Sequence, residues 1–155
     1  MTDSFLTASR TQSPRPLALV LGTNEIASAV AVHLNAAGSA VILSHDPFPP
    51  VIRRAMAFHD ALFGDRAVVE RVEGEFAETS RAFALVFAKP RSVVVTPLHL
   101  SELIALRTPQ ILIDARMQKH RVTPDLRGIV QLTIGSGRTS QSAPIAISPS
   151  KRISR

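Results

Sequence analysis

The sequence predicts an α/β domain with a doubly wound, mainly parallel sheet of about six strands and helices on both faces. Short β-branched runs alternate with longer segments of helical periodicity, which is the pattern of a parallel sheet covered by helices. The length of 155 residues suits one domain. Apolar residues make up 45 % and charged residues 19 % of the chain, as in ordinary globular proteins.

Six runs are predicted as strands because they are short, apolar and rich in β-branched side chains. They are Leu17–Gly22, Ala40–Ser44, Ala67–Val72, Ser92–Thr96, Gln110–Asp114 and Ile129–Ile134. Right-handed crossovers between parallel strands would produce a Rossmann-like sheet over residues 17–138.

Four helices are predicted between these strands. The first has one apolar face and ends at Gly38; the face comprises Ile26, Val30, Leu34 and Ala37. The second, Val51–Phe63, ends at Gly64, and its face comprises Ile52, Met56, His59 and Phe63. The third, Phe76–Ala88, aligns Phe76, Phe83 and Phe87. The fourth, Leu98–Leu106, lies between Pro97 and Pro109.

Both ends of the chain differ from this domain in composition. Residues 1–16 are rich in Ser, Thr, Pro and Arg, which predicts a disordered arm. Residues 139–155 predict a basic tail, in which Ile145–Ile147 could add a short edge strand. The arm carries +1 and the tail +3 of the net charge of +6, leaving +2 for the domain. With no Trp or Tyr to stack on bases, we do not expect a nucleic-acid partner.

Composition excludes several classes of chemistry. The chain has no cysteine, so it forms no disulfide, offers no thiolate to zinc and carries no thiol nucleophile. No apolar run reaches the about 18 residues of a spanning helix, and no secretory signal precedes the domain. We therefore expect a cytoplasmic protein without a membrane partner. Exposed edge strands would also allow a homodimer.

Ligands of such sheets bind beyond the carboxyl ends of the strands. The first strand leads into Gly22, Thr23, Asn24 and Glu25, where a dinucleotide-binding G-x-G-x-x-G loop would lie. Gly22 fits that loop, but Asn24 replaces its second glycine, and a Cβ there obstructs a pyrophosphate. Amides at a helix N-terminus hold anions, whereas Glu25 adds a negative charge. Both a cofactor loop and a plain strand-to-helix turn remain open.

Two further positions follow the second predicted strand. Asp46 lies 24 residues after Gly22, roughly where an acid binds the ribose of a dinucleotide, although an Asp-Pro pair is also an ordinary turn. Arg53 and Arg54 could hold a phosphate or a pterin tail in forked geometry, or form a solvated helix face.

The last candidates follow the fifth and sixth predicted strands. Asp114 precedes Arg116, which indicates either a ligand contact or a salt-bridged loop. Gly135 and Gly137 permit an anion-binding nest of backbone amides, or a turn. The histidines match no metal-binding motif, and no hydrolase elbow or P-loop occurs, so spacing identifies no catalytic residue.

Several segments together resemble a known family. These segments, in chain order, are residues 22–28 (GTNEIAS), 50–58 (PVIRRAMAF) with Ala61, 69–74 (VERVEG), 113–116 (IDAR) and 134–137 (IGSG). Their order resembles that in the selenium-dependent molybdenum hydroxylase system proteins, whose Rossmann-like domain is related to that of xanthine dehydrogenase accessory proteins. The resemblance spans about residues 17–138, and the early end of the chain suggests a truncated member.

This resemblance implies a role in maturation of a molybdenum hydroxylase, including handling or sulfuration of the molybdenum cofactor. It implies a pterin-phosphate ligand, and a molybdenum hydroxylase or a cofactor sulfurtransferase as partner. Because the chain has no cysteine, the sulfur would travel on another protein. Two alternatives remain: an NAD(P)-dependent oxidoreductase that uses the Gly22 loop and Asp46, and a Rossmann-shaped assembly module that has lost its ligand.

Overall fold

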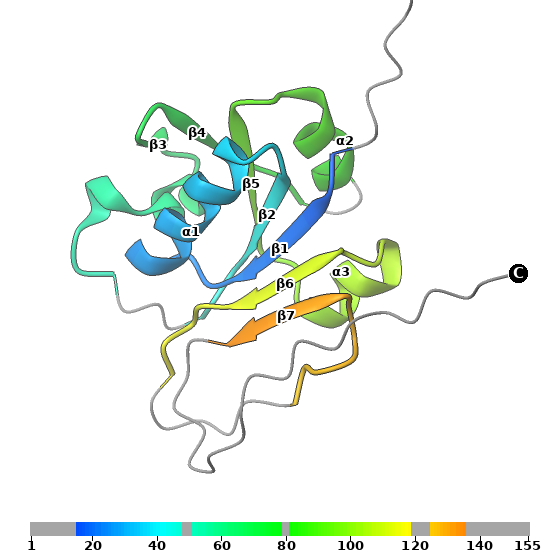
Figure 1. Cartoon of the computed structure of the whole chain (residues 1–155). Coiled ribbons are helices and arrows are strands. Elements are labelled where there is room, and N and C mark those ends of the chain that lie inside the picture. The colour runs from blue at the N-terminus through cyan, green and yellow to red at the C-terminus, as the bar shows by residue number, and fades with distance from the viewer. Residues whose placement is uncertain (1–14, 48–50, 79–80, 119–124, 136–155) are drawn as a thin grey trace, which may run out of the picture.

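The computed structural model describes residues 15–47, 51–78, 81–118 and 125–135. They form an α/β structure around one seven-stranded sheet (Figure 1). Across the sheet the strand order is β3-β4-β5-β2-β1-β6-β7. The strands are β1 (Leu17–Leu21), β2 (Ala40–Ser44), β3 (Ala67–Val69), β4 (Val72–Phe76), β5 (Ser92–Thr96), β6 (Ile111–Asp114) and β7 (Leu132–Gly135).

The central strand β1 lies between β2 and β6, and all three run parallel. The chain passes from β1 to β2 on one side and later returns to β6 on the other side. Leu21, the last residue of β1, is in register with Ser44 of β2 and Asp114 of β6. The loops that leave these three strands therefore meet at one edge of the sheet, which is called the carboxyl edge below.

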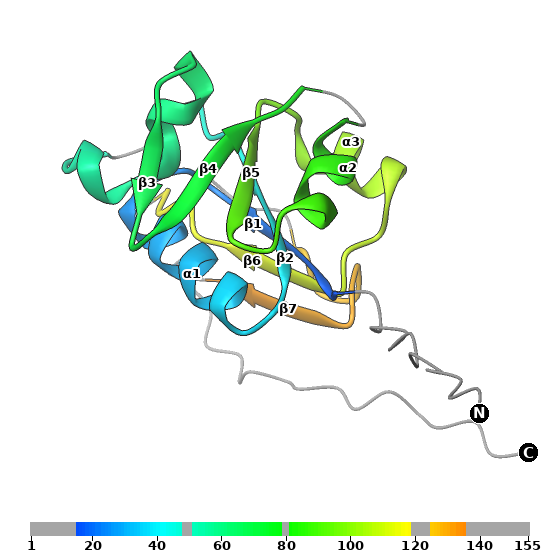
Figure 2. The ribbon, with the colours of Figure 1, turned by 90° about the horizontal axis from the view of Figure 1, so that it is seen from above.

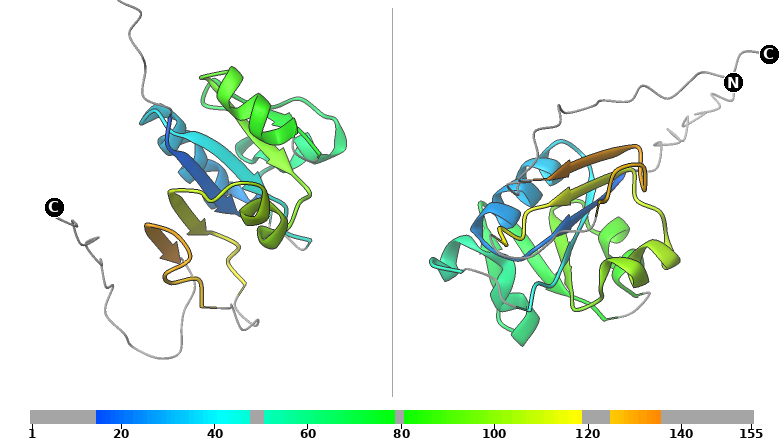
Figure 3. Two further views of the ribbon diagram at one scale, coloured as in Figure 1. Left: turned by 90° about the vertical axis from the view of Figure 1, so that its right-hand side faces the viewer. Right: turned by 90° about the horizontal axis from the view of Figure 1, so that it is seen from below.

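Strands β1, β2 and β5 are buried on both faces, which is why each reads as a continuous apolar run. One face packs against α1 (Glu25–Ala36) and the short helix η2 (Phe58–Phe63). The opposite face packs against α2 (Arg81–Ala88) and α3 (Leu100–Leu106). Seen from above and from below, the sheet lies between these two groups of helices (Figures 2 and 3).

Helix α1 has the predicted bounds within a residue, and the predicted buried face is correct in part, since Val30 and Leu34 are partly buried against the core whereas Ala37 is exposed. The inner face carries small and polar side chains, namely Ala27, Ser28, Ala31, Val32 and Asn35, and Ile26 is exposed. Small side chains let the helix approach the sheet closely, and hydrogen bonds compensate the polar ones. One example is the Asn35 amide, which donates to the carbonyl of Ser92 at 3.0 Å.

The predicted helix Val51–Phe63 is wrong. This segment forms two 3₁₀ helices, η1 (Arg54–Met56) and η2, and it ends as predicted at Gly64, whose φ is 82°. The predicted apolar face points outward, with Ile52 88 % and Phe63 70 % exposed. Phe58 provides the buried anchor instead.

Phe58 joins three parts of the fold. Its backbone N–H donates to the buried hydroxyl of Ser28 on α1 at 2.9 Å. Its ring lies so close to Gly74 of β4 that a Cβ there would be 2.7 Å from Phe58 Cδ1. The segment between β2 and β3 is thus fixed to both α1 and the sheet.

The prediction of one strand over Ala67–Val72 is wrong, because the chain turns back within this range. Strands β3 and β4 form an antiparallel hairpin whose turn residues Glu70 and Arg71 have φ values of 47° and 68°. Left-handed turns of this type are usually marked by Asn-Gly or Asp-Gly. The sequence lacks that mark, and the predicted sheet was therefore one strand short.

The helices on the second face start later than predicted. Phe76 ends β4 rather than opening a helix, and α2 begins at Arg81. Helix α3 begins at Leu100, after the proline-led loop. The last predicted strand is shifted as well, since β7 covers Leu132–Gly135.

Most of the predicted arm and the predicted tail lie outside the described residues. Arg15, near the end of the arm, is described, and its guanidinium donates to the carbonyl of Ser39 at 2.6 Å and to that of Val86 at 3.3 Å. Ser39 directly precedes β2 and Val86 lies in the last turn of α2, so Arg15 joins the start of β2 to α2.

We predict that Gly74→Ala lowers the free energy of unfolding by about 1–3 kcal/mol, because the new methyl group would overpack against Phe58. Gly135→Ala is the matched control, since a Cβ there meets nothing within 4 Å, and it should change stability by less than about 0.5 kcal/mol. Urea unfolding of both variants measures the difference. Equal stability of the two would contradict the anchoring role of Phe58.

Candidate functional site

The predicted cofactor loop lies at the carboxyl edge, where β1 ends beside β6. Gly22 adopts φ +116° and donates its N–H to the carbonyl of Ser44 at 2.9 Å. A Cβ at Gly22 would lie 3.3 Å from the carbonyl carbon and oxygen of Ala115, which follows β6. Glycine is required here both by the backbone conformation and by the close approach of the β6 loop.

Asn24 bridges the two loops and is only 2 % exposed. Its Nδ2 donates to the carbonyl of Ala115 at 2.8 Å, and its Oδ1 accepts the N–H of Ala27 at 2.9 Å. The second bond caps the N-terminus of α1. The side chain that replaces the second glycine of the dinucleotide motif therefore spans the space between β1 and β6.

Thr23 is completely buried, and its Oγ1 lies 2.9 Å from Nδ1 of His59 on η2. The ring of His59 stacks on His45, with centroids 6.2 Å apart. Burial lowers the pKa of both histidines. The pKa of His45 is lowered further by His99 and that of His59 by His45, while Asp46 acts on both in the opposite direction without reversing the shift. Both rings are therefore neutral at physiological pH and add no cationic charge to the site.

Asp46 is also completely buried, and its Oδ1 accepts a hydrogen bond from the side-chain amide of Gln118 at 3.0 Å. This bond joins the loop after β2 to the loop after β6. The ribose-binding role of Asp46 stays a prediction, and the structure places the carboxylate inside the protein.

Asp114 and Arg116 form a salt-bridged loop, which was one of the two interpretations of this segment from sequence, the other being a ligand contact. The guanidinium donates from Nε to Oδ1 at 2.9 Å and from a terminal nitrogen to Oδ2 at 2.7 Å. The hydrogen bond to Asp114 raises the pKa of Arg116. Gly135 ends β7 at the same edge and is exposed, and Gly137 lies outside the described residues.

Glu25, the first residue of α1, forms a bridge to the segment that follows β2. Its carboxylate accepts the backbone N–H of Ile52 at 2.6 Å and also that of Arg53. Burial acts to raise the pKa of Glu25, but these backbone donors and the charge of Arg53 lower it overall. This contact, called the Glu25 bridge below, fixes the start of the arginine segment (residues 51–56) beside the start of α1.

The two arginines of this segment point to different surroundings. A terminal nitrogen of Arg53 lies 4.0 Å from the sulfur of Met56, within the segment itself. Arg54 is 77 % exposed at its side chain, and its Nε lies 3.8 Å from Asp60. Arg54 thus contacts η2, whereas Arg53 contacts its own segment, and the forked phosphate site stays a prediction.

A hollow of about 270 Å³ lies between η1, η2 and β3. It is lined by Arg54, Ala55, Ala57, Asp60, Arg66, Ala67 and Val68. Sequence reasoning missed Arg66, because only the hairpin turn after Val69 folds β3 back along β4 and brings Arg66 toward the carboxyl edge. No signal in the sequence alone indicated that turn.

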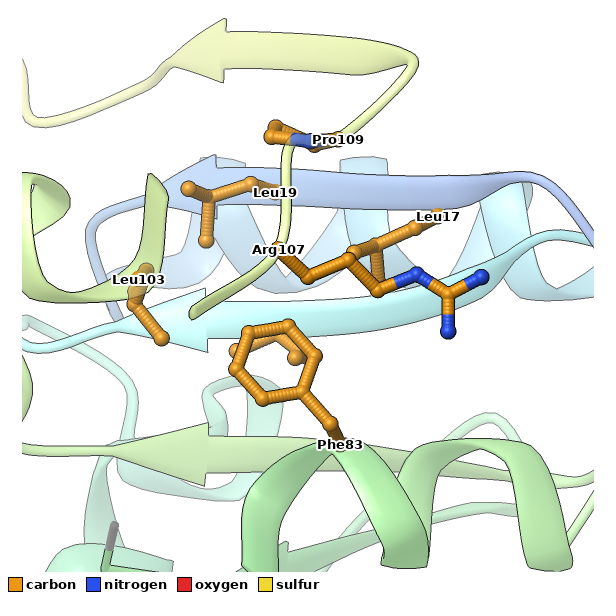
Figure 4. Close-up of a pocket in the computed structure, with 7 residues that line it drawn as sticks. Leu17, Leu19, Phe83, Leu103, Arg107 and Pro109 are labelled. Atoms are coloured by element: carbon orange, nitrogen blue, oxygen red, sulfur yellow. The ribbon is translucent and has the colours of Figure 1, made fainter. Parts of the chain in front are cut away.

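A second cavity, of about 10 Å³, lies on the opposite face of the sheet. Its lining is mostly apolar, with the side chains of Leu17, Leu19, Leu103 and Phe83 around it and Arg107 at its margin (Figure 4). Its volume is near the lower limit for one water molecule. We regard it as a packing defect rather than a ligand site.

Comparison with family models, with curated proteins and with solved structures finds no match to this chain. Within the described ranges, no cluster of three or more His, Cys, Asp or Glu side chains could hold a metal ion. In the same part of the chain, no helix is both long and apolar enough to cross a membrane.

The Glu25 bridge predicts a pH-dependent contribution to stability. A lowered carboxylate pKa stabilises the fold above the ordinary value of 4.5 and loses that effect as pH falls through the lowered value. Glu25→Gln should therefore be less stable than the wild type at neutral pH, and the difference should shrink below pH 4.5. Thermal unfolding at several pH values measures it. Glu70→Gln, on the exposed hairpin turn, should show no such trend; a pH-independent difference for Glu25→Gln would contradict the bridge.

Proposed function

We propose that this chain is a Rossmann-like accessory factor for maturation of a molybdenum hydroxylase. In this proposal it holds the phosphate-bearing end of a pterin cofactor at the carboxyl edge, through the arginine segment. The observation that carries the proposal is the Glu25 bridge, which fixes this segment beside the start of α1 by two backbone hydrogen bonds. The segment also lies within one of the stretches that carry the family resemblance, residues 50–58.

The strand order supports the Rossmann-like assignment. From β5 to β7 the sheet order is β5-β2-β1-β6-β7, in which β2 and β5 are added on one side of β1 and β6 and β7 on the other. A doubly wound sheet has this 3-2-1-4-5 arrangement, and its ligands bind at the carboxyl ends beside the point where the strand order reverses. Added strands β3 and β4 extend the sheet on the β5 side and carry one wall of the hollow.

The contacts at the loop favour a pterin phosphate over a dinucleotide. A dinucleotide would need close approach of its pyrophosphate to the backbone at Asn24, where the side chain is bonded to Ala115 and to the start of α1. It would also need the ribose to reach Asp46, which is completely buried and accepts a hydrogen bond from Gln118. Both features weigh against the NAD(P)-dependent oxidoreductase.

The residues of the arginine segment fit the anionic end of the cofactor. A guanidinium offers a planar fork of donors that matches phosphate oxygens, and that of Arg54 is mostly exposed. When bound, the cofactor supplies the sulfur ligands that carry molybdenum. With no cysteine in the chain, a partner such as a cofactor sulfurtransferase would have to deliver any added sulfur.

A second candidate is an assembly module that contacts the hydroxylase without any ligand. The bond between Asn24 and Ala115 and that between Asp46 and Gln118 favour it, because the protein's own groups occupy the ordinary ligand positions. It differs from the first proposal in one measurable respect, since its complex with the enzyme would not depend on the cofactor.

To test the proposal, the protein is mixed anaerobically with molybdenum cofactor released from a purified molybdenum enzyme and separated by gel filtration. Pterin in the protein fraction is measured by fluorescence, and NADPH is run in parallel. We expect retention of pterin but not of NADPH, and roughly tenfold weaker retention in Arg54→Ala than in Arg91→Ala, a matched loss of one exposed charge. Retention of NADPH would support the oxidoreductase. A stable hydroxylase complex without pterin would support the assembly module.

A further inference from the structure

We propose that the hollow between Arg54 and Arg66 is a binding site for a phosphate monoester, with the two guanidiniums on opposite sides of the phosphate. As the seat of the cofactor's phosphate it rests on the proposed function, although its chemistry can be tested without the cofactor. The hollow lies between η1, η2 and β3, apart from the glycine loop.

Charge is the first argument. Arg54 and Arg66 come from different walls and are 77 % and 80 % exposed. Each has one loose carboxylate contact through Nε, at 3.8 Å to Asp60 and 3.6 Å to Glu73. Neither contact has the short, two-point geometry of a forked ion pair, in contrast to Arg116 on Asp114. Both guanidiniums can therefore turn their terminal N–H groups toward a shared anion.

Rigid walls are the second argument. Helix η2 is held by the bond from the Phe58 N–H to Ser28 and by the ring contact with Gly74. On the other side, Ala67 and Val68 belong to β3 and pair with β4. The walls are thus set by the sheet before a ligand arrives, which reduces the ordering cost of binding.

Size and lining set the class of ligand. Three alanines, Ala55, Ala57 and Ala67, leave room between the arginines. The volume of about 270 Å³ is below the roughly 300–1,000 Å³ of pockets that enclose drug-sized ligands. The hollow therefore suits a phosphate with the adjoining part of an organic group, while the rest of the ligand would lie outside.

Asp60 is the one acidic side chain in the lining. It is mostly buried and would lie near the bound anion, so it opposes binding by repulsion. The same carboxylate only weakly holds the exposed Arg54. Removing its charge should therefore strengthen the site more than the loss of that weak contact weakens it.

The test uses phenyl phosphate and inorganic phosphate as probes, titrated by calorimetry into the whole chain at constant ionic strength. We expect Arg54→Ala and Arg66→Ala each to weaken binding of phenyl phosphate by about tenfold. Arg91→Ala removes the same charge outside the hollow and should change it by less than about twofold. Asp60→Asn should bind several-fold more tightly. Circular dichroism of each variant confirms that it is folded.

Equal weakening by all three arginine variants would overturn the proposal, because it would indicate only diffuse attraction by positive charge. No binding to the wild type would overturn it as well. If phenyl phosphate binds as expected but molybdenum cofactor is not retained, the hollow stands and the proposed function fails. If cofactor is retained but Arg66→Ala has no effect, the function stands and the hollow is not its site.

Discussion

The structure depends on the side chain of Asn24, which joins the loop after β1 to the loop after β6. Its amide nitrogen donates to Ala115, and its oxygen caps the first turn of α1. One buried side chain thereby joins the loops of β1 and β6, between which the order of the strands changes from one side of β1 to the other. Gly22 makes this possible, since any Cβ there would press on the carbonyl of Ala115. A position that admits a ligand in dinucleotide-binding sheets is here part of the framework.

Further hydrogen bonds and contacts connect the loops around β1 to the neighbouring elements. Asp46 and Gln118 join the β2 and β6 loops, and the Glu25 bridge attaches the arginine segment to α1. Phe58 then fixes η2 between α1 and β4. The positive charges of Arg54 and Arg66 therefore lie around the hollow and not at the glycine loop. The proposed function and the proposed phosphate site both place the ligand at this hollow, along the carboxyl edge from the glycine loop.

Much of the fold could be predicted from the sequence because the central strands are continuous apolar runs. β2 and β5 have the predicted bounds, and β1 and β6 differ by a single residue. The face of α1 could be predicted only in part from its large apolar residues, since close packing on the sheet selects Ala27 and Ala31 while Val30 and Leu34 pack beside them. The hairpin was hidden because Glu70 and Arg71 take left-handed conformations without a glycine. The arginine segment has a helical period in sequence, but it is held by the two hydrogen bonds to Glu25 and by the anchor at Phe58 that follows it, which periodicity does not encode. For the site, the sequence draws attention to Asn24, whereas its partner Ala115 and the place of Arg66 in the lining of the hollow required the tertiary structure.

A crystal structure grown with both phenyl phosphate and NADPH tests the central claim most directly. The account predicts phosphate between Arg54 and Arg66, with Asn24 still bonded to the carbonyl of Ala115. A pyrophosphate at the start of α1, with Asn24 turned away from Ala115, would contradict it.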